Sequence, residues 1–460
     1  MNPVLTWQQG WRYGLMGLPL AFVALPLYVL LPNHYARSFG VSLATLGAVL
    51  VAVRLFDTLI DPLLGRWADN LHQHSATVNR APATVLRWAA LAALLLCTGF
   101  GLLFFPPEAL QADTTQVLLW LGATLLLTTV AFSALTILHQ AWGARLGGDA
   151  LYRSRVVAWR EGLGLVGVIV ASISPVAFGL PATIALLVIA SIAGWLAWRR
   201  GPAPARVRVV QPSGPRTRPV AAGEGTTSTA LGHPAAQAAD HPWPAEPAVS
   251  LWLPWKRSQF RQLISVFMLN GIASAIPATL MLFFVQDRLQ APPSAEPLFL
   301  GSYFVCAALS IPLWLKLVPR LGLARTWGLG MGLSVAVFAF AAGLGAGDVT
   351  AFVIVCALSG VALGTDLALP AALLAGVIQH HGDQQQSEGA YFGWWAFATK
   401  LNLALAAGVA LPALGLLGYT PGATDPEALQ TLTVAYCLLP CALKTLAAVL
   451  LYLLIIRKNP

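Results

Sequence analysis

Two carboxylates lie in an otherwise apolar stretch of the sequence, AVLVAVRLFDTLIDPLLGRWADN at residues 48–70. An unpaired ionised side chain in an apolar interior is very costly. Asp57 and Asp61 are four residues apart, which puts both carboxylates on one face of a helix, and Arg54 lies within about 60° of the same face. Two carboxylates this close in a low dielectric repel each other, so one keeps its proton unless a cation enters. The spacing predicts a proton or cation site whose occupancy sets the local charge.

The alternative interpretation is a static salt bridge with Arg54 that only holds helices together. One arginine cannot neutralise two acids, which favours the ion site. A further base, Lys400, lies about ten residues inside another apolar stretch, too deep for snorkelling to explain its position entirely. We expect Arg54 and Lys400 to balance the charge of the aspartates. Hydroxyls of a third apolar stretch are candidates for additional cation ligands, chiefly Thr129 and Ser133.

The elements that must position these residues are predicted to be transmembrane helices. Apolar residues make up 57% of the 460 residues and charged residues 10%, whereas a soluble chain carries roughly a quarter of charged residues. Twelve apolar stretches are long enough to cross about 30 Å of hydrocarbon. They lie at about 11–32, 42–64, 83–105, 115–139, 157–179, 181–198, 259–285, 297–318, 326–346, 350–377, 391–418 and 428–456. We therefore expect an all-α membrane protein with twelve transmembrane helices.

The charges indicate how this chain is oriented in the membrane. If the N-terminus is cytoplasmic, most arginines and lysines outside the apolar stretches fall on the cytoplasmic side, and few remain on the opposite side. This asymmetry predicts that both termini are cytoplasmic. It also explains the net charge of +9 without nucleic acid as a partner. We expect a multi-pass protein of the bacterial inner membrane, a monomer whose partners are membrane lipid and a small-molecule substrate.

Residues 199–258 interrupt the apolar pattern. They are rich in Ala, Pro, Gly and Thr and have too few large apolar residues to build a core, so we expect a flexible cytoplasmic linker. The linker separates six apolar stretches in residues 1–198 from six in residues 259–460. Two six-helix halves joined by a long loop are typical of the major facilitator fold, in which the halves rock around a site near the bilayer midplane.

Three stretches together resemble the glycoside–pentoside–hexuronide:cation symporters, the family of melibiose permease. They are RLFDTLIDPLLGRWADN, QQQSEGAYFGWWAFATKLNLALAAG (384–408) and YRSRVVAWREGLGLVG. The resemblance implies that Asp57 and Asp61 bind the coupling cation and that Lys400 matches the family's lysine. It also places Arg160 at the substrate, and a weaker match adds Asn270.

The sequence departs from that family where acids hold the sugar hydroxyls. The first apolar stretch has no acid, and TILHQAWGARLGGD has Leu138 or His139 at the corresponding position. Trp142 could still stack on a sugar or on another flat group. His139 and Gln140 either line the substrate cavity or are packing residues. We expect simple galactosides to bind weakly or not at all.

Other charged residues of the apolar stretches have less specific interpretations. We expect Lys444 to snorkel towards the cytoplasmic side. Asp366 and Glu161 are interpreted either as polar pairs that fix helix packing or as functional groups. Asp69, in GRWADN, is expected to brace a turn between helices rather than to bind substrate.

The predicted function is cation-coupled symport of a small organic solute, of the sugar or glycoside class by family resemblance. A first alternative is symport of an amphipathic or lipid-like solute, which the missing acids favour, and a second is a membrane protein that does not transport. The sequence contains no HExxH, Walker or GxSxG motif, so we predict neither an enzyme nor a cofactor or bound metal. Ile60 offers no oxygen before the second aspartate, and a proton needs only one carboxylate. We therefore expect H⁺ rather than Na⁺ as the coupling ion.

Overall fold

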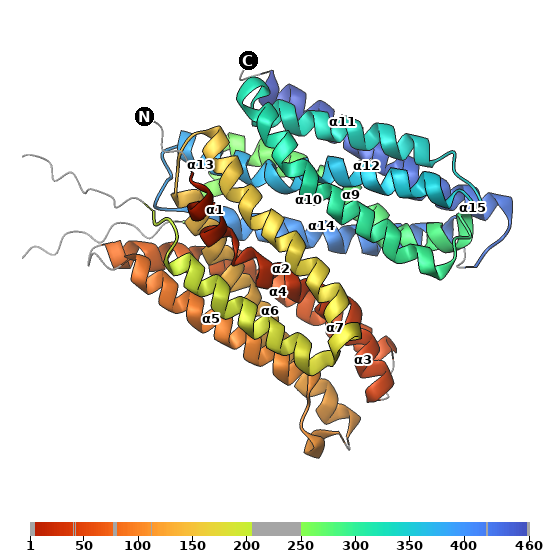
Figure 1. Ribbon diagram of the computed structural model, residues 1–460, viewed down its shortest axis with the longest axis horizontal. Coiled ribbons are helices and arrows are strands. Elements are labelled where there is room, and N and C mark those ends of the chain that lie inside the picture. Colours follow the sequence, from red (N-terminus) through yellow and green to blue (C-terminus); the bar gives the residue numbers. More distant parts are fainter. Residues whose placement is uncertain are drawn as a thin grey trace, which may run out of the picture.

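A computed structural model describes residues 5–39, 41, 43–76, 81–111, 113–204, 250–419 and 422–457. Every regular element in these ranges is a helix, as the sequence predicts (Figure 1). Large apolar side chains point outward on many helices, among them Leu59 (66% exposed), Leu119 (70%) and Leu309 (69%). Extensive apolar exposure of this kind is typical of a surface that contacts lipid. The structure is therefore an all-α membrane protein.

Three helices of the first half begin after residues whose side chains satisfy free backbone N–H groups. Thr6 accepts from Gln9 N, and the carboxylates of Asp113 and Asp149 accept from Thr115 N and Tyr152 N. The elements are α1 (Trp7–Gly14), α2 (Gly17–Leu25), η1 (Pro26–Leu30), α3 (Leu31–Ser38), α4 (Leu43–Ala76), α5 (Ala81–Phe104), η2 (Glu108–Leu110), α6 (Thr114–Arg145) and α7 (Ala150–Arg199).

The element α7 contains two of the predicted spans. The chain turns back at Gly179, whose φ of 80° lies in the left-handed region that glycine adopts readily (Figure 1). The two candidate membrane spans of this element, Ala150–Pro175 and Ala177–Arg199, match the stretches predicted at 157–179 and 181–198.

The second half contains α8 (Leu253–Lys256), α9 (Ser258–Phe283), η3 (Phe284–Arg288), η4 (Pro293–Ala295), α10 (Glu296–Leu321), α11 (Leu323–Ala341), α12 (Val349–Ala368), α13 (Pro370–His380), α14 (Glu388–Leu416), α15 (Pro426–Thr433), η5 (Val434–Leu438), α16 (Leu439–Leu451) and η6 (Tyr452–Ile456). Two predicted spans are not single regular helices. The span at 11–32 divides at Leu15 and again at Pro26, and the span at 428–456 contains π-helical turns before Pro440 and at Tyr452. Proline lacks an N–H donor and disturbs the helical hydrogen-bond ladder, which accounts for the breaks beside Pro26 and Pro440.

Nine helices of the described residues are long and apolar enough to cross a membrane, and each coincides with one of the predicted spans. The other three predicted spans, 11–32, 42–64 and 391–418, are also helical: they contain α1 to α3, α4 and α14. The arrangement is therefore consistent with twelve transmembrane helices. The division into 1–198, 199–258 and 259–460 stays a prediction, because residues 205–249 of the linker lie outside the described residues.

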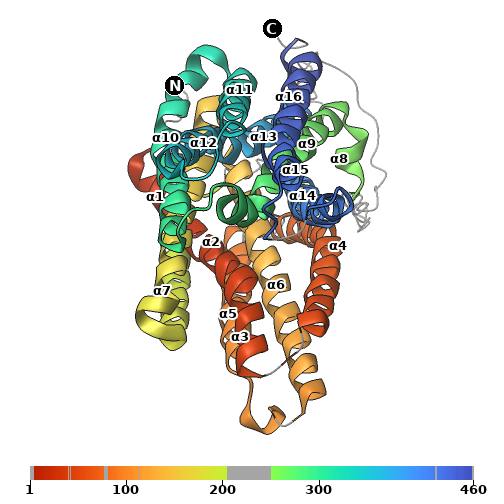
Figure 2. The ribbon, with the colours of Figure 1, turned by 90° about the vertical axis from the view of Figure 1, so that its right-hand side faces the viewer.

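The helices of the two halves form two groups, which Figure 2 shows one above the other. The groups meet where α4 and α6 contact α14 and where α7 contacts α10 and α13. α4 and α14 run antiparallel, because Asp69 lies at Gly389 whereas Asp61 lies at Lys400. Asp57 and Asp61 on α4 and Lys400 on α14 therefore lie on two helices that meet between the halves.

Candidate functional site

Lys400 of α14 lies between the two aspartates of α4. Its Nζ is 2.7 Å from Asp57 Oδ2 and 2.9 Å from Asp61 Oδ2. It donates hydrogen bonds to Asp61 Oδ1 (2.9 Å) and to Ser133 Oγ (2.7 Å). The Ser133 hydroxyl donates to Asp57 Oδ1 at 2.9 Å. The structure thus brings together four residues that the sequence selects, from α4, α6 and α14.

This cluster is almost closed to solvent. Asp61 is 0% exposed, Ser133 2% and Asp57 4%. Within it, two carboxylates face one ammonium, so one negative charge is left over when all three groups are ionised. A buried unbalanced charge is costly, and a proton or a monovalent cation would neutralise it. The arrangement can therefore bind one positive charge in addition to that of Lys400.

Two further residues predicted for this site form other contacts than those with the aspartates. The Thr129 hydroxyl donates to the carbonyl of Leu126 in its own helix, 3.2 Å away, and no hydrogen bond between described residues joins it to either aspartate. Arg54 is partly buried one turn before Thr58, whose hydroxyl donates to its carbonyl. The roles of Thr129 in cation binding and of Arg54 in charge balance stay predictions.

The residues predicted to contact substrate from α6 and α7 fall into two groups. Arg160 is 8% exposed and pairs with Glu161, with 2.6 Å between Nη2 and Oε1. Arg160 and Gln140 line one small cavity of about 10 Å³, together with Phe392 from the second half. A cavity needs about 10–15 Å³ to hold one water molecule, so a sugar does not fit here in this state.

His139 and Trp142 lie instead in a packed group of rings. The His139 ring stacks on Tyr13 with 4.3 Å between centroids, and Nε2 is 3.0 Å from the Tyr13 carbonyl oxygen. Trp142 is 1% exposed, packs edge-on against Trp198 and donates its indole N–H to the carbonyl of Pro202. Both residues are packing residues in this state, the interpretation that the sequence left open for His139.

Asn270 and Lys444 form a second buried polar cluster around Asp366, inside the second half. Asp366 Oδ1 accepts from Asn270 Nδ2 (3.1 Å) and from Trp327 Nε1 (2.7 Å). Lys444 donates to Asp366 Oδ2 (3.0 Å) and to Ser274 Oγ (2.9 Å). The prediction that Lys444 snorkels was wrong, because its ammonium finds a carboxylate within the helix bundle. Asn270, predicted to contact substrate, holds this carboxylate in the present state.

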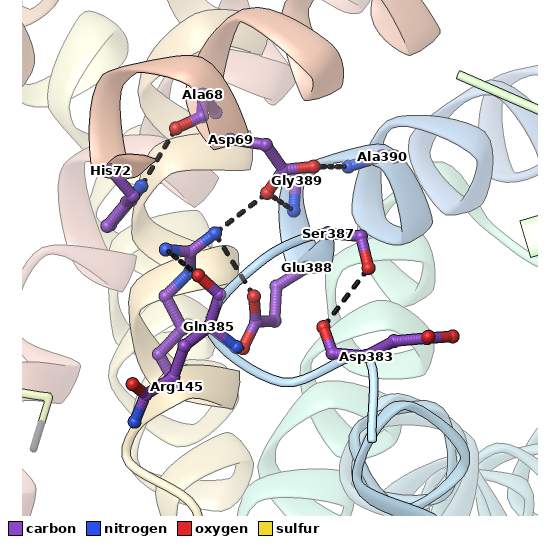
Figure 3. A network of polar contacts seen from close by, with 10 residues as sticks. All are labelled: Ala68, Asp69, His72, Arg145, Asp383, Gln385, Ser387, Glu388, Gly389 and Ala390. Carbon is purple, nitrogen blue, oxygen red and sulfur yellow. Dashed lines mark hydrogen bonds and ion pairs between the residues drawn. The ribbon is translucent and has the colours of Figure 1, made fainter. Parts of the chain in front are cut away.

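The halves are also joined by an ionic contact that the sequence did not predict, formed by Asp69, Arg145 and Glu388 and called the latch below (Figure 3). Arg145 Nη2 is 2.8 Å from Asp69 Oδ1 and 3.0 Å from Glu388 Oε2. The Asp69 carboxylate also accepts from the backbone N–H groups of Gly389 (2.6 Å) and Ala390 (2.7 Å). Asp69 of the first half therefore caps the N-terminus of α14 in the second half, where the helix dipole favours an anion.

The residues of the latch are buried, and the residues around it form further hydrogen bonds and an ion pair. Asp69 and Glu388 are both 0% exposed. His72 Nδ1 donates to the carbonyl of Ala68 (2.8 Å), and burial together with the charge of Arg145 lowers the pKa of His72 to about 3, so its ring is neutral. Next to the latch, Arg257 pairs with Asp383 (2.6 Å). One feature of the sequence could have indicated the latch. Glu388 lies at the start of an apolar stretch, and acidic residues are common at the N-terminus of a helix.

Glycines let α4 and α14 approach at backbone distance between the latch and Lys400. A Cβ atom at Gly65 would overlap the carbonyl oxygen of Gly389, and one at Gly393 would lie 2.7 Å from the carbonyl oxygen of Asp61. Small residues at helix contacts allow such close packing in membranes. The contact between the halves is therefore continuous from Asp69 to Lys400.

Solved structures with the same fold are membrane transporters. A bacterial homologue of the iron transporter ferroportin in its outward-facing state is 15% identical, with a TM-score of 0.66 over 96% of this chain and 97% of that chain. The E. coli fucose:proton symporter FucP is 13% identical (TM-score 0.60, 95% and 98% covered), and the human organic anion transporter MFSD10 (TETRAN) is 18% identical (0.55, 95% and 99%). The fold is that of the major facilitator transporters.

The sequence matches the family described as MFS/sugar transport protein over residues 12–197 and 252–458. The protein therefore belongs to this family, and the family resemblance predicted from its motifs is confirmed. A comparison with curated protein sequences found no match.

Proposed function

We propose that the protein is a proton-coupled symporter that carries a sugar or glycoside across the bacterial inner membrane, with both termini in the cytoplasm. Membership of a sugar transport family supports the solute class. The observation that carries cation coupling is Lys400, whose ammonium contacts both Asp57 and Asp61. An internal cation placed between two buried carboxylates marks the position that an external cation would occupy.

Coupling follows from competition for these carboxylates. When Lys400 binds them, it links α14 of the second half to α4 of the first. A bound proton or cation reduces the attraction between the aspartates and Lys400 and so weakens this link. A ligand shifts the equilibrium between two states only if it binds them with different affinity. Here the affinities differ because Lys400 competes for the aspartates only in the state in which α14 packs against α4.

A proton suits the site better than sodium. Sodium needs several oxygens in place of its water shell. The cluster offers the two carboxylates and Ser133, while Ile60 contributes no oxygen and Thr129 bonds within its own helix. A proton needs only one carboxylate, and the neighbouring acid favours its binding.

The proposed solute site lies between the halves near Arg160 and Gln140. Both residues line the small cavity against Phe392, on the side of the latch. In this state the latch and the α4–α14 contact close that side, so the solute would enter from the opposite end, where α3 and α15 lie (Figure 1).

Uptake into proteoliposomes tests this function. Purified protein is reconstituted, and radiolabelled pentoses, hexoses and glycosides are offered under an inward proton gradient without sodium, or under a sodium gradient at equal pH. We expect at least one solute to accumulate only with the proton gradient. Accumulation that needs sodium and ignores the proton gradient would exclude the proton, and accumulation without any gradient would exclude coupling.

A groove between the halves favours an amphipathic solute as a second candidate. It has a volume of about 500 Å³ and lies between α7 and α10, with mostly apolar walls that include Trp159, Leu163 and Ile311, and with Arg155 and the 71% exposed Trp7 at its rim. Its position would let a lipid-like molecule reach the transporter from the membrane, with an anionic group near Arg155.

A variant that fills the groove distinguishes the two candidate solutes. Gly162 lines the groove, and a Cβ atom there meets nothing within 4 Å, so Gly162→Leu should fold and narrow the groove. If the solute is amphipathic, Gly162→Leu should reduce lysophospholipid uptake several-fold. If the solute is a sugar, Gly162→Leu should leave sugar uptake unchanged. Gly101→Leu, at an equally open position of α5, is the control. Equal lysophospholipid uptake in both variants would remove the groove from the transport path.

A further inference from the structure

A cavity of about 180 Å³ lies entirely within the second half, enclosed by α9, α10, α11, α12 and α16. None of its walls belongs to the first half, and it contains neither Arg160 nor the aspartates of α4. An engineered apolar cavity of about 150 Å³ is known to bind benzene, so this cavity has room for a molecule the size of one ring.

The cavity has a polar end and an apolar end. The polar end is formed by Ser274, Asp366 and Lys444, and Ser359 lies seven residues before Asp366 on α12, about 10 Å along the helix. On α9 the lining continues from Ser274 for seven residues, about 10 Å of helix, to Met281. That end is lined by rings and sulfur atoms, from Phe299, Phe338, Tyr436, Met281 and Cys356. A ligand that fits is amphipathic.

The charge at the polar end indicates an uncharged ligand. The Asp366 carboxylate is matched by Lys444 and also accepts from Asn270 and Trp327, so the pair is neutral and the acid is well satisfied. A charged ligand would upset this balance in surroundings that are otherwise apolar, where an uncompensated charge is costly.

Two hydrogen-bonding groups of the cavity lining remain available. An ammonium has three donors, and Lys444 uses two of them, on Asp366 and Ser274. The Ser359 hydroxyl is buried, with 7% of the residue exposed, and it has no hydrogen-bond partner among the described residues. A ligand hydroxyl could therefore bond to Ser359.

The cavity also has an entrance. Ala278 of α9 and Leu300 of α10 line it and are exposed, Leu300 by 44%. We propose that this cavity is a second ligand site, which binds an uncharged ring-sized molecule with a hydroxyl group, of the phenol class, its hydroxyl at Ser359 and its ring among the aromatic side chains. Neither Lys444 nor Ser359 contacts the Asp57–Asp61 cluster, so the site stands or falls independently of cation coupling.

Ligand-detected NMR on the full-length protein in nanodiscs, corrected for empty nanodiscs, tests the proposal with phenol, benzene and benzoate. Wild type should bind phenol more tightly than benzene and benzoate. Ser359→Ala should weaken phenol binding roughly five- to tenfold, the usual effect of one lost hydrogen bond, and leave benzene binding unchanged. Ala278→Phe, which fills the exposed entrance, should weaken both.

Ser302→Ala is the matched control, because Ser302 lies on α10 outside the cavity lining and donates to the Phe299 carbonyl. It should bind all three probes like wild type. Circular dichroism melting of each variant confirms that it is folded. A phenol-to-benzene affinity ratio that is the same in wild type and Ser359→Ala would overturn the proposal. So would benzoate binding more tightly than phenol, or phenol binding that Ala278→Phe leaves intact.

Discussion

At the scale of single residues, the unequal number of acids and bases in the buried cluster matters most. Lys400 contacts both carboxylates, so neither aspartate is left without a cationic neighbour. Removing one carboxylate leaves a balanced pair of the other aspartate and Lys400, which still holds the helices together. The fold therefore tolerates the loss of one acid, whereas a site that needs an excess negative charge does not.

We predict that Asp57→Asn or Asp61→Asn lowers gradient-driven uptake in proteoliposomes at least tenfold, because the remaining carboxylate is matched by Lys400 and no longer attracts a proton. The amide keeps the shape of the side chain, so the melting temperature should stay within a few degrees of wild type. Glu108→Gln, at an exposed position outside the cluster, is the control. Wild-type accumulation in either aspartate variant would remove these residues from the coupling mechanism.

Among the residues predicted to contact substrate, some should affect folding stability and others should affect solute binding. Trp142→Ala opens a hole in a packed ring cluster and should cost about 3–5 kcal/mol of folding stability, seen as a lower melting temperature.

Arg160→Ala should weaken binding of the transported solute at least tenfold with a smaller change in melting temperature. Wild type should give no binding signal with millimolar melibiose in calorimetry. A clear melibiose signal, or solute affinity unchanged in Arg160→Ala, would contradict this interpretation.

At the scale of helices, the antiparallel pair α4 and α14 takes part in two ionic contacts between the halves, the Lys400 cluster and, together with Arg145 of α6, the latch. Asp57 and Asp69 are twelve residues apart on α4, about 18 Å along its axis, and Lys400 and Glu388 have the same separation on α14. The glycine contacts lie between them. Side chains could not fit between these backbones, so separation of the halves on this side must break the whole contact.

We predict that Gly65→Ala weakens this contact, because its Cβ overlaps the Gly389 carbonyl and overpacking costs about 1–3 kcal/mol. The melting temperature in detergent should fall by several degrees. Gly47→Ala lies on the same helix where a Cβ meets nothing, and it should melt like wild type. Equal melting of the two variants would show that α4 and α14 do not pack this closely.

The sequence predicted the helical spans well because length and hydrophobicity are local properties. The breaks at Leu15 and in the last span were not predicted, since a proline in a membrane helix can be accommodated without a break when neighbours satisfy the freed carbonyls. Asp57 and Asp61 were found by their spacing. Hydroxyls of α6, chiefly Thr129 and Ser133, were candidates for the cluster, and only the rotation of α6 against its neighbours brings Ser133 into it.

The sequence did not predict which residues of distant segments pair with each other. Asp69 bonds to Gly389, 320 residues later, and Lys444 bonds to Asp366 across 78 residues. Nothing local distinguishes these side chains from ones that snorkel or face solvent. Which face of a helix packs is also set by the tertiary structure, so the sequence could not separate Trp142, which packs, from Arg160, which borders a cavity.

At the scale of the whole molecule, the halves meet on the side of the latch and diverge towards the end where α3 and α15 lie (Figure 1). The latch is a buried ion pair shared by both halves and reinforced by two backbone N–H groups. Breaking a buried pair by removing one partner typically costs about 3–5 kcal/mol. Moving an equilibrium from 99:1 to 1:99 needs about 5.5 kcal/mol, so the latch alone supplies most of what a switch between two states requires.

We predict that Asp69→Asn shifts the protein towards a state that is open on the latch side, because the neutral amide no longer matches Arg145 or the positive N-terminus of α14. Spin labels at Arg66→Cys in α4 and Ser258→Cys in α9, in a background without the five native cysteines, report the distance across this side by pulsed electron paramagnetic resonance. The variant should add a longer distance that makes up about half of the population or more. Asp348→Asn, at an exposed acid between α11 and α12, is the control and should keep the wild-type distribution. If Asp69→Asn also keeps it, the latch does not set the balance between the two states.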